Sequence, residues 1–305
     1  MEYIIETENL TKQYGTSTVV DNINLHVPKG KIYGLLGRNG AGKTTAMKMM
    51  LQLVHPTGGA IRLFGTNCME NGRDLYRKIG SIIETPGFYN NLTAYENLCL
   101  SGRLRGKLKA ENIYKSLEVV GLQNERTKLF AEYSLGMKQR LGIAAAIMHE
   151  PELLILDEPT NGLDPIGISE IRSFLFDLSH IKGTTILISS HILSEIEQIA
   201  DFIGIMHGGR LIEEVNMAEL HKRKRKYIEF DISDTTVAAK LIENVYQISD
   251  YSIQGSILKV FDRTHNCGEI NKTFIENGLT VTELILCEEH LEDYFSDLIG
   301  GGGID

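Results

Sequence analysis

A glycine-rich stretch near the N-terminus is the feature that most constrains this chain. It satisfies the pattern G-x-x-x-x-G-K-S/T, in which glycines allow backbone N–H groups to turn toward a phosphate. The apolar segment Ile32–Leu36 before it is typical of a buried strand, and Thr45–Leu51 after it is typical of a helix. Because a helix N-terminus attracts anions, this order predicts a phosphate-binding loop rather than an ordinary glycine-rich turn. The loop comprises Gly37, Arg38, Asn39, Gly40, Ala41, Gly42, Lys43, Thr44 and Thr45.

A second motif supplies the carboxylates that nucleotide chemistry requires. The apolar strand Leu153–Asp157 ends in Asp157 and is followed directly by Glu158. Lys43 is expected to reach the β- and γ-phosphates, while Thr44 and Asp157 are expected to hold Mg²⁺. Glu158 can polarise an attacking water as a general base. Beside a phosphate-binding loop, this interpretation is favoured over a buried strand that merely ends in a solvated acidic loop.

The distribution of apolar segments predicts an α/β fold, and together with the phosphate-binding loop it resembles the P-loop NTPase (RecA-like) fold. Continuous apolar strands separated by helices indicate a mostly parallel sheet with helices on both faces. Alternating segments at 3–10 and 19–27 predict an antiparallel β subdomain. Residues of about 85–150 form a helical block that interrupts the alternation, so we expect an inserted helical subdomain within a nucleotide-binding domain at 1–220.

A smaller α+β domain is expected at 227–299. Its segments follow the order β-α-β-β-α-β, which resembles a ferredoxin-like unit, and a last helix is expected at Leu291–Leu298. The basic run at 222–226 before it is interpreted as a solvated helix end rather than a lipid or RNA contact. No residue of this domain carries a chemical signature, and its role is left open.

Composition excludes several classes of protein. The formal net charge of −9 argues against a general nucleic-acid-binding surface, and no nucleic-acid partner is expected. The four cysteines form no C-x-x-C pair, which favours free thiols in a reducing cytosol. No apolar run reaches the roughly 18 residues that a membrane span needs, so any membrane role requires spans from another chain.

Further motifs connect the chain to a known family. An aromatic residue, Tyr14, precedes the phosphate-binding loop in the sequence. Ser134–Arg140 reads S-L-G-M-K-Q-R. Asn161–Asp164 reads N-G-L-D, and His191 follows two serines after an apolar strand. In order and spacing, these motifs over residues 1–220 resemble those of the ATP-binding subunits of ABC transporters.

The resemblance implies a specific arrangement around ATP and Mg²⁺. Two copies would pack head to tail, so that each ATP meets Lys43 of one chain and Ser134 and Gly136 of the other. Tyr14 would stack on adenine. His191 would contact the γ-phosphate and link it to Asp164 of the second copy. The family further implies ATP hydrolysis, a separate integral membrane permease, and a peripheral location on the cytoplasmic face of the membrane.

The chain departs from the usual family pattern at three positions. Leu135 and Met137 stand where the signature normally has glycine, which implies a looser contact with the γ-phosphate. Glu84 stands where most relatives have glutamine, a side chain that approaches Mg²⁺ and the attacking water. The additional carboxylate near Asp157 and Glu158 predicts a stronger dependence on the cation and a raised pKa for one of these acids.

Within the family, two readings of the chain's biological role remain. Ile83–Tyr89, the altered signature and Leu291–Phe295 resemble the bacitracin and lantibiotic resistance branch, which implies export or removal of an antimicrobial peptide. Phe88 and Tyr89 suit either docking of a permease helix or packing beneath the helical subdomain. The alternative is a soluble ABC ATPase acting in translation or DNA repair. A GTPase is disfavoured because Asn271–Phe274 does not complete the base-reading motif N-K-x-D.

Overall fold

A six-stranded sheet forms the centre of the N-terminal part of the chain, in the order β11-β10-β4-β9-β8-β7. Neighbouring strands run parallel except at the β10–β11 hairpin. Every residue of β4, β8 and β9 is buried, which explains why these segments are mostly apolar and carry their polar residues only at the strand ends. The strands are β4 (Ile32–Leu36), β7 (Ile79–Ile82), β8 (Leu153–Asp157), β9 (Thr185–Ser190), β10 (Phe202–His207) and β11 (Arg210–Asn216).

The computed structural model describes residues 2–68, 72–84, 86–106, 109–223, 226–261 and 265–288. They divide into two compact units, the first ending at Ala218 and the second beginning at Glu219. Each unit is described by itself. No helix of the described residues is long and apolar enough to cross a membrane.

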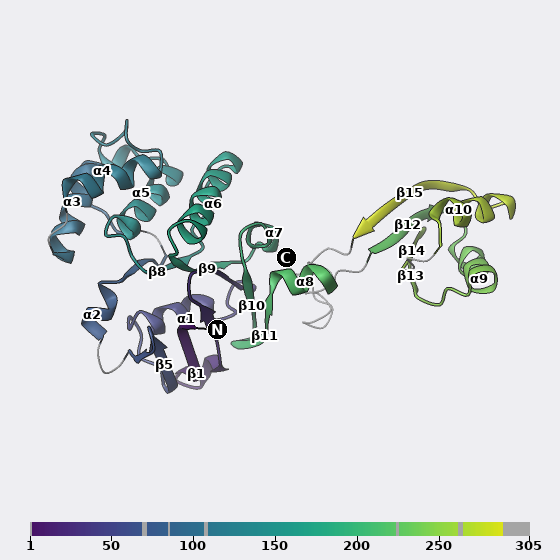
Figure 1. Ribbon diagram of the computed structural model, residues 1–305, viewed down its shortest axis with the longest axis horizontal. Coiled ribbons are helices and arrows are strands. Elements are labelled where there is room, and N and C mark those ends of the chain that lie inside the picture. The colour runs from purple at the N-terminus through teal and green to yellow at the C-terminus, as the bar shows by residue number, and fades with distance from the viewer. Residues whose placement is uncertain are drawn as a thin grey trace. The chain divides into compact units, whose positions relative to one another are not determined.

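A second sheet of the first unit is antiparallel and shares a core with the central sheet. Helix α1 (Lys43–Met50) contributes Ala46, Met47, Met49 and Met50 to this core, where they meet Ile5 and other strand residues. The strands are β1 (Tyr3–Tyr14), β2 (Ser17–Ile23), β3 (His26–Pro28), β5 (Gly58–Leu63) and β6 (Thr66–Asn67). Burial of α1 between the sheets fixes the helix that follows the glycine loop (Figure 1).

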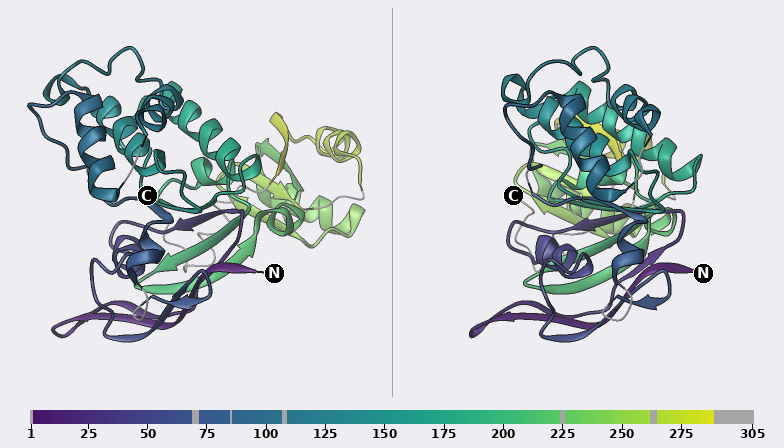
Figure 2. Two further views of the ribbon diagram at one scale, coloured as in Figure 1. Left: turned by 60° about the vertical axis from the view of Figure 1, so that its left-hand side comes forward. Right: turned by 90° about the vertical axis from the view of Figure 1, so that its left-hand side faces the viewer.

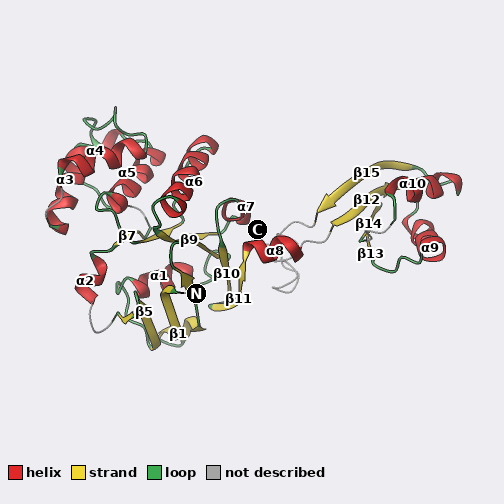
Figure 3. Ribbon diagram, in the orientation of Figure 1, coloured by secondary structure: helices red, strands yellow, loops and turns green. Residues whose placement is uncertain are grey.

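Most helices of the first unit gather on one side of the strands (Figures 2 and 3). Helix α3 begins with a capping box, in which Thr93 and Glu96 satisfy each other's backbone N–H groups. Ser134 and Asp164 cap α5 and α6 in the same manner, by accepting a hydrogen bond from a backbone N–H in the first turn. Besides α1, the helices of this unit are α2 (Gly72–Tyr76), α3 (Ala94–Arg105), α4 (Ala110–Val119), the 3-10 turn η1 (Phe130–Glu132), α5 (Leu135–Ile147), α6 (Pro165–His180) and α7 (Leu193–Glu197), of which α3 to α6 lie together on one side of the strands.

The second unit carries a four-stranded antiparallel sheet in the order β13-β14-β12-β15. Phe230 and Phe274 meet edge to face in its core, with ring centroids 5.1 Å apart. Its elements after α8 (Met217–Arg223) are β12 (Lys226–Ile232), α9 (Thr235–Tyr246), β13 (Tyr251–Gln254), β14 (Ile257–Val260), α10 (Cys267–Glu276) and β15 (Val281–Glu288). This is the β-α-β-β-α-β order predicted from the sequence. The helix predicted at Leu291–Leu298 lies outside the described residues.

The observed sheets confirm the predicted fold class, with two differences in detail. The segment 19–27, predicted as one strand, is divided between β2 and β3. The hairpin β10–β11 was not predicted, although it turns at Gly208 and Gly209, both at positive φ, and β10 is the direct neighbour of β4. The apolar run Phe202–Met206 ahead of a glycine pair is the signal that could have identified it.

A substitution at Gly80 of β7 tests how closely the helical subdomain packs on the sheet. A Cβ atom there would overlap the backbone oxygen of Ala146 in α5. We expect Gly80→Ala to lower the free energy of unfolding by about 1–3 kcal/mol, as overpacking in a filled core does. Urea denaturation followed by circular dichroism measures this change. Gly87→Ala is the control, since nothing lies within 4 Å of a Cβ at Gly87; equal losses in the two variants would contradict the packing argument.

Candidate active site

The glycine loop between β4 and α1 leaves the start of α1 open to an anion. Gly42, the N-cap of α1, has a φ of 101°, and no side chain caps the helix there. A Cβ on Gly42 would lie 2.7 Å from the backbone oxygen of Val19, so no larger residue fits without a shift. The first N–H groups of a helix have no partner within the helix. At α1 they are therefore available, together with the helix dipole, to bind phosphate oxygens.

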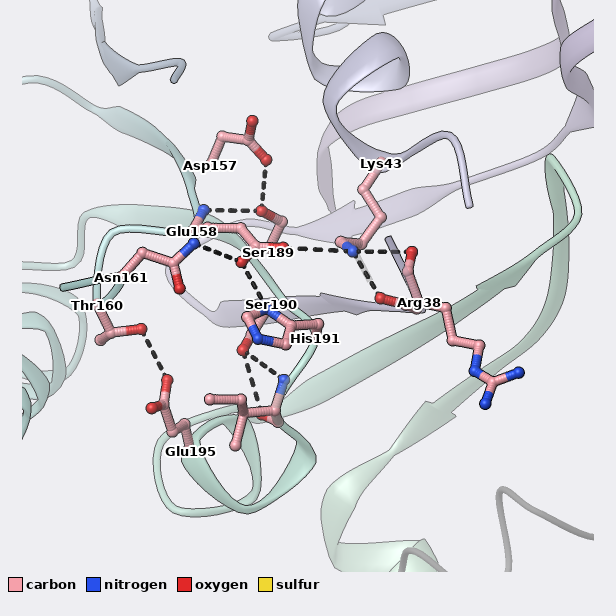
Figure 4. Close-up of polar contacts among 12 residues, drawn as sticks. Arg38, Lys43, Asp157, Glu158, Thr160, Asn161, Ser189, Ser190, His191 and Glu195 are labelled. Atoms are coloured by element: carbon pink, nitrogen blue, oxygen red, sulfur yellow. Dashed lines mark hydrogen bonds and ion pairs between the residues drawn. The ribbon is translucent and has the colours of Figure 1, made fainter. Parts of the chain in front are cut away.

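Lys43 is the first residue of α1, and its side chain is only 5% exposed. Its ammonium donates to the backbone oxygens of Gly37 and Arg38, at 2.5 and 3.3 Å. It also lies 3.4 Å from Glu158 Oε1 (Figure 4). The Lys43 ammonium is thus surrounded by oxygen acceptors, two from backbone carbonyls and one from a carboxylate, and phosphate oxygens are acceptors of the same kind.

Asp157 connects three segments of the site through hydrogen bonds. Its carboxylate accepts from Thr44 Oγ1 at 2.8 Å and from Ser189 Oγ at 2.6 Å. Ser189 Oγ in turn accepts from the backbone N–H of Glu158 at 2.9 Å (Figure 4). The strand order places β9 between β4 and β8, so these bonds cross the carboxyl edge of the sheet.

The donor set fits Mg²⁺ bound together with a nucleotide. Hydroxyl and carboxylate oxygens, as on Thr44 and Asp157, are the ligands that Mg²⁺ prefers. Within the described ranges, no group of three or more His, Cys, Asp or Glu residues could hold a metal ion on its own. One or two protein oxygens plus substrate phosphates is the usual way that Mg²⁺ is held in nucleotide sites.

Glu158 is surrounded by donors. Its Oε2 lies 2.6 Å from His191 Nδ1 and accepts a bond of 2.8 Å from Asn161 Nδ2. Burial alone would raise the pKa of Glu158, but the hydrogen bonds from His191 and Asn161 and the charge of Lys43 outweigh it, so the pKa is lowered. The expectation of a raised pKa is therefore wrong for Glu158. Its φ of 47° is uncommon for a residue other than glycine and turns the side chain out of the strand direction.

Glu84 follows the neighbouring strand β7 by two residues and has a different partner. Its carboxylate, 65% exposed, lies 2.5 Å from the ammonium of Lys48 on α1. Its φ of 61° is again positive. The structure therefore pairs Glu84 with a lysine, and its approach to Mg²⁺ stays a prediction.

The remaining predicted residues lie at helix or strand ends of the same unit. Ser134 Oγ accepts from the Met137 N–H at 3.2 Å, and Asp164 Oδ1 accepts from the Gly167 N–H at 2.8 Å. Tyr14 ends β1 and is half exposed, with the Lys12 ammonium 4.8 Å from its ring centroid. Their roles toward adenine or a second copy stay predictions.

Three contributions to the site were missed by the sequence analysis. Ser189 was noted only as preceding His191, and Asn161 only as part of a motif. The third is the bond of 2.7 Å from Thr160 Oγ1 to Glu195, which ties the Asn161 segment to α7. Ser189 could have been found from register alone, because it pairs with Asp157 between β8 and β9.

The fold and this site define the chain as a P-loop nucleoside triphosphatase. Comparison with known proteins then identifies the family within this class.

A family model described as ABC transporter matches residues 20–161. The chain is 69% identical to the bacitracin transport ATP-binding protein BcrA of Enterococcus faecalis, over all of this chain and 99% of that protein. It is 49% identical to the lantibiotic transport ATP-binding protein SrtF of Streptococcus pyogenes, over 69% of this chain and 90% of that one. The chain belongs to the ATP-binding proteins of ABC transporters, and it is an ATPase.

Solved structures agree with this assignment. An ATP-binding subunit of an ABC transporter is 32% identical, with a TM-score of 0.66, over 72% of this chain and 92% of that one. A dimeric ATP-binding cassette bound to ADP and phosphate has a TM-score of 0.65 at 23% identity, over 70% of this chain and 98% of that one, and supports the fold alone.

The role of Glu158 is tested by Glu158→Gln. We expect this variant to retain ATP binding and to lose about 10²–10⁴-fold in hydrolysis rate, because the amide cannot accept a proton from water. It should also accumulate as a dimer with ATP, as seen by size-exclusion chromatography. A variant that hydrolyses ATP at the normal rate would remove Glu158 from the role of general base.

Glu84→Gln tests the additional carboxylate separately. We expect ATP turnover to remain at least partly intact and the required Mg²⁺ concentration to fall, since one negative charge near the triphosphate is removed. Initial rates measured over a series of Mg²⁺ concentrations give the result. An unchanged Mg²⁺ titration would contradict a role for Glu84 near the metal.

Proposed function

We propose that ATP hydrolysis by this chain powers the export, or removal from the membrane, of an antimicrobial peptide through a separate membrane permease. The observation that carries the proposal is the match of 69% identity to a bacitracin transport ATP-binding protein over nearly the full length of both chains. A bacitracin transport ATP-binding protein of Bacillus licheniformis is also 53% identical over 100% of both chains. Both matches extend through the second unit, so they do not rest on the ATPase motifs that all members of the family share.

In this proposal each site residue has a task in ATP hydrolysis. Lys43 and the N–H groups at the start of α1 bind and orient the phosphates. Thr44 and Asp157 would hold Mg²⁺, which offsets phosphate charge. Glu158 accepts a proton from the attacking water, and His191, 2.6 Å from Glu158, orients that carboxylate. Phosphoryl transfer needs little covalent help from a protein, so placement and charge are sufficient.

Formation of a homodimer around ATP is part of the proposal. Ser134 caps α5, and the N–H groups of that helix start point in the direction that binds anions. Leu135 beside it is 60% exposed although it is apolar, which favours contact with another surface. In the ATP-bound pair, Ser134 and Gly136 of one copy would face the phosphates held by Lys43 of the other.

Docking to the permease is proposed at the face that carries Tyr89. This side chain is 60% exposed, whereas Phe88 packs edge to face against Phe130, with ring centroids 5.2 Å apart. Phe88 therefore packs inward, and the exposed Tyr89 is the residue proposed for the contact with the permease. A groove of about 720 Å³ lined by residues of α2, α3 and α4 lies in the same unit and includes Tyr76 and Arg105.

A soluble role in translation or DNA repair is not favoured. The full-length relatives above carry transport names, and a net charge of −9 does not suit a surface that follows nucleic acid. With a permease, the chain would work at the cytoplasmic face of the membrane.

Transport in inverted membrane vesicles tests the proposal. Vesicles containing this chain and its permease should accumulate labelled bacitracin or a labelled lantibiotic when ATP is added, and vesicles with Glu158→Gln should not. Cells carrying the active pair should also tolerate higher concentrations of the same peptide. ATP-dependent uptake of an unrelated small drug, without uptake of either peptide, would overturn the proposed cargo while leaving the ATPase assignment intact.

A further inference from the structure

We propose that Lys48 is a positioning residue for Glu84: it neutralises this carboxylate and holds it toward the far end of α1 until the site binds nucleotide. The ion pair of 2.5 Å joins the last turn of α1 to the end of β7, across 36 residues of sequence. The inference concerns the ATPase reaction and does not depend on the transported cargo.

Strand register places Glu84 among other negative charges. In the parallel pair β7–β8, Ile82 lies opposite Leu156. Glu84 follows Ile82 by two residues, as Glu158 follows Leu156, so both acids leave the same edge of the sheet. Asp157 lies at this edge as well, at the end of β8. A triphosphate bound at the start of α1 would therefore meet negative charge from the ends of both strands, and this repulsion favours compensation by cations.

Helix α1 supplies that compensation with two lysines. Lys43 lies 3.4 Å from Glu158 and Lys48 lies 2.5 Å from Glu84, so each lysine matches one acid from a neighbouring strand. The two lysines are five residues apart, which is about 7–8 Å along a helix axis. Pairing with Lys48 therefore draws the Glu84 carboxylate along α1, away from the end at which the phosphate loop lies. The cation also suits the last turn of α1, where the helix dipole is negative.

The Lys48–Glu84 ion pair is weak enough to break when nucleotide binds, and we call this reversible pair the latch. The Lys48 side chain is 29% exposed and that of Glu84 is 65% exposed, so water competes with the ion pair. Exposed pairs of this kind are weak. Most relatives have glutamine at position 84, which has the same length as glutamate but no charge. In this chain the ion pair with Lys48 compensates the additional charge of Glu84. Opening of the latch would release the carboxylate toward the metal and the attacking water.

A double-mutant cycle on the full-length chain tests the proposal. The probe is a fluorescent non-hydrolysable ATP analogue, and the quantity is the ratio of its affinities with and without Mg²⁺. Lys48→Gln frees the Glu84 carboxylate to repel the uncompensated triphosphate, so we expect this ratio to rise by about twofold to fivefold, the range that one exposed ion pair supports. In the Glu84→Gln background, Lys48→Gln should change the ratio much less, and Lys48→Arg should preserve the original ratio.

The controls distinguish the latch from a general effect of charge. Lys115→Gln removes a lysine from a comparable exposed pair, Lys115–Glu111 at 2.7 Å on α4, and should leave the ratio unchanged. Circular dichroism confirms that each variant is folded. Equal changes in both backgrounds would show that Lys48 acts only through net charge, and no change in either would show that the pair is an inert surface contact. Both results overturn the proposal.

Discussion

The interaction on which the site depends is the pair of hydrogen bonds that the buried Asp157 carboxylate accepts from Thr44 and Ser189, at 2.8 and 2.6 Å. A buried carboxylate is costly unless hydrogen-bond donors replace the lost water. Here the two donors are the hydroxyl of Thr44, at the start of α1, and the hydroxyl of Ser189, near the end of β9. The bonds therefore hold the start of α1, the end of β8 and the end of β9 in one arrangement. Lys43 and Glu158, one residue from Thr44 and Asp157, are placed opposite each other as a consequence.

Backbone conformation at two strand ends completes this arrangement. Glu84 and Glu158 follow the adjacent parallel strands β7 and β8, and both have positive φ. Such a conformation is unfavourable for a residue with a Cβ atom and persists where its surroundings hold it. At Glu158 these are the N–H bond to Ser189 and the side-chain bonds to His191 and Asn161. The strain presents both acids at the same sheet edge, where α1 supplies a lysine for each.

The sequence predicted the parts of the fold and site that depend on local pattern. The phosphate loop, the strand ending in Asp157 and the helical insertion each follow from residues close together in the chain, and the structure contains all of them. The contacts that were missed join distant segments. Ser189 reaches Asp157 across 32 residues, and Lys48 reaches Glu84 across 36. Neither pair has a local signature, because strand order and register bring the partners together. The hairpin β10–β11 is different, because its local signal, an apolar run before a glycine pair, is present in the sequence and was overlooked.

The altered signature connects the proposed second-subunit contact to the catalytic base. Leu135 packs directly on Gly162, where a Cβ atom would overlap its side chain, and Gly136 faces Leu163. The start of α5 is therefore in direct contact with the segment Gly162–Leu163. Asn161, the next residue along, donates to Glu158. Leucine in place of the usual glycine at 135 supplies the side chain that makes this contact. We therefore expect a partner that presses on the exposed part of Leu135 to influence the orientation of the Glu158 carboxylate through Gly162 and Asn161.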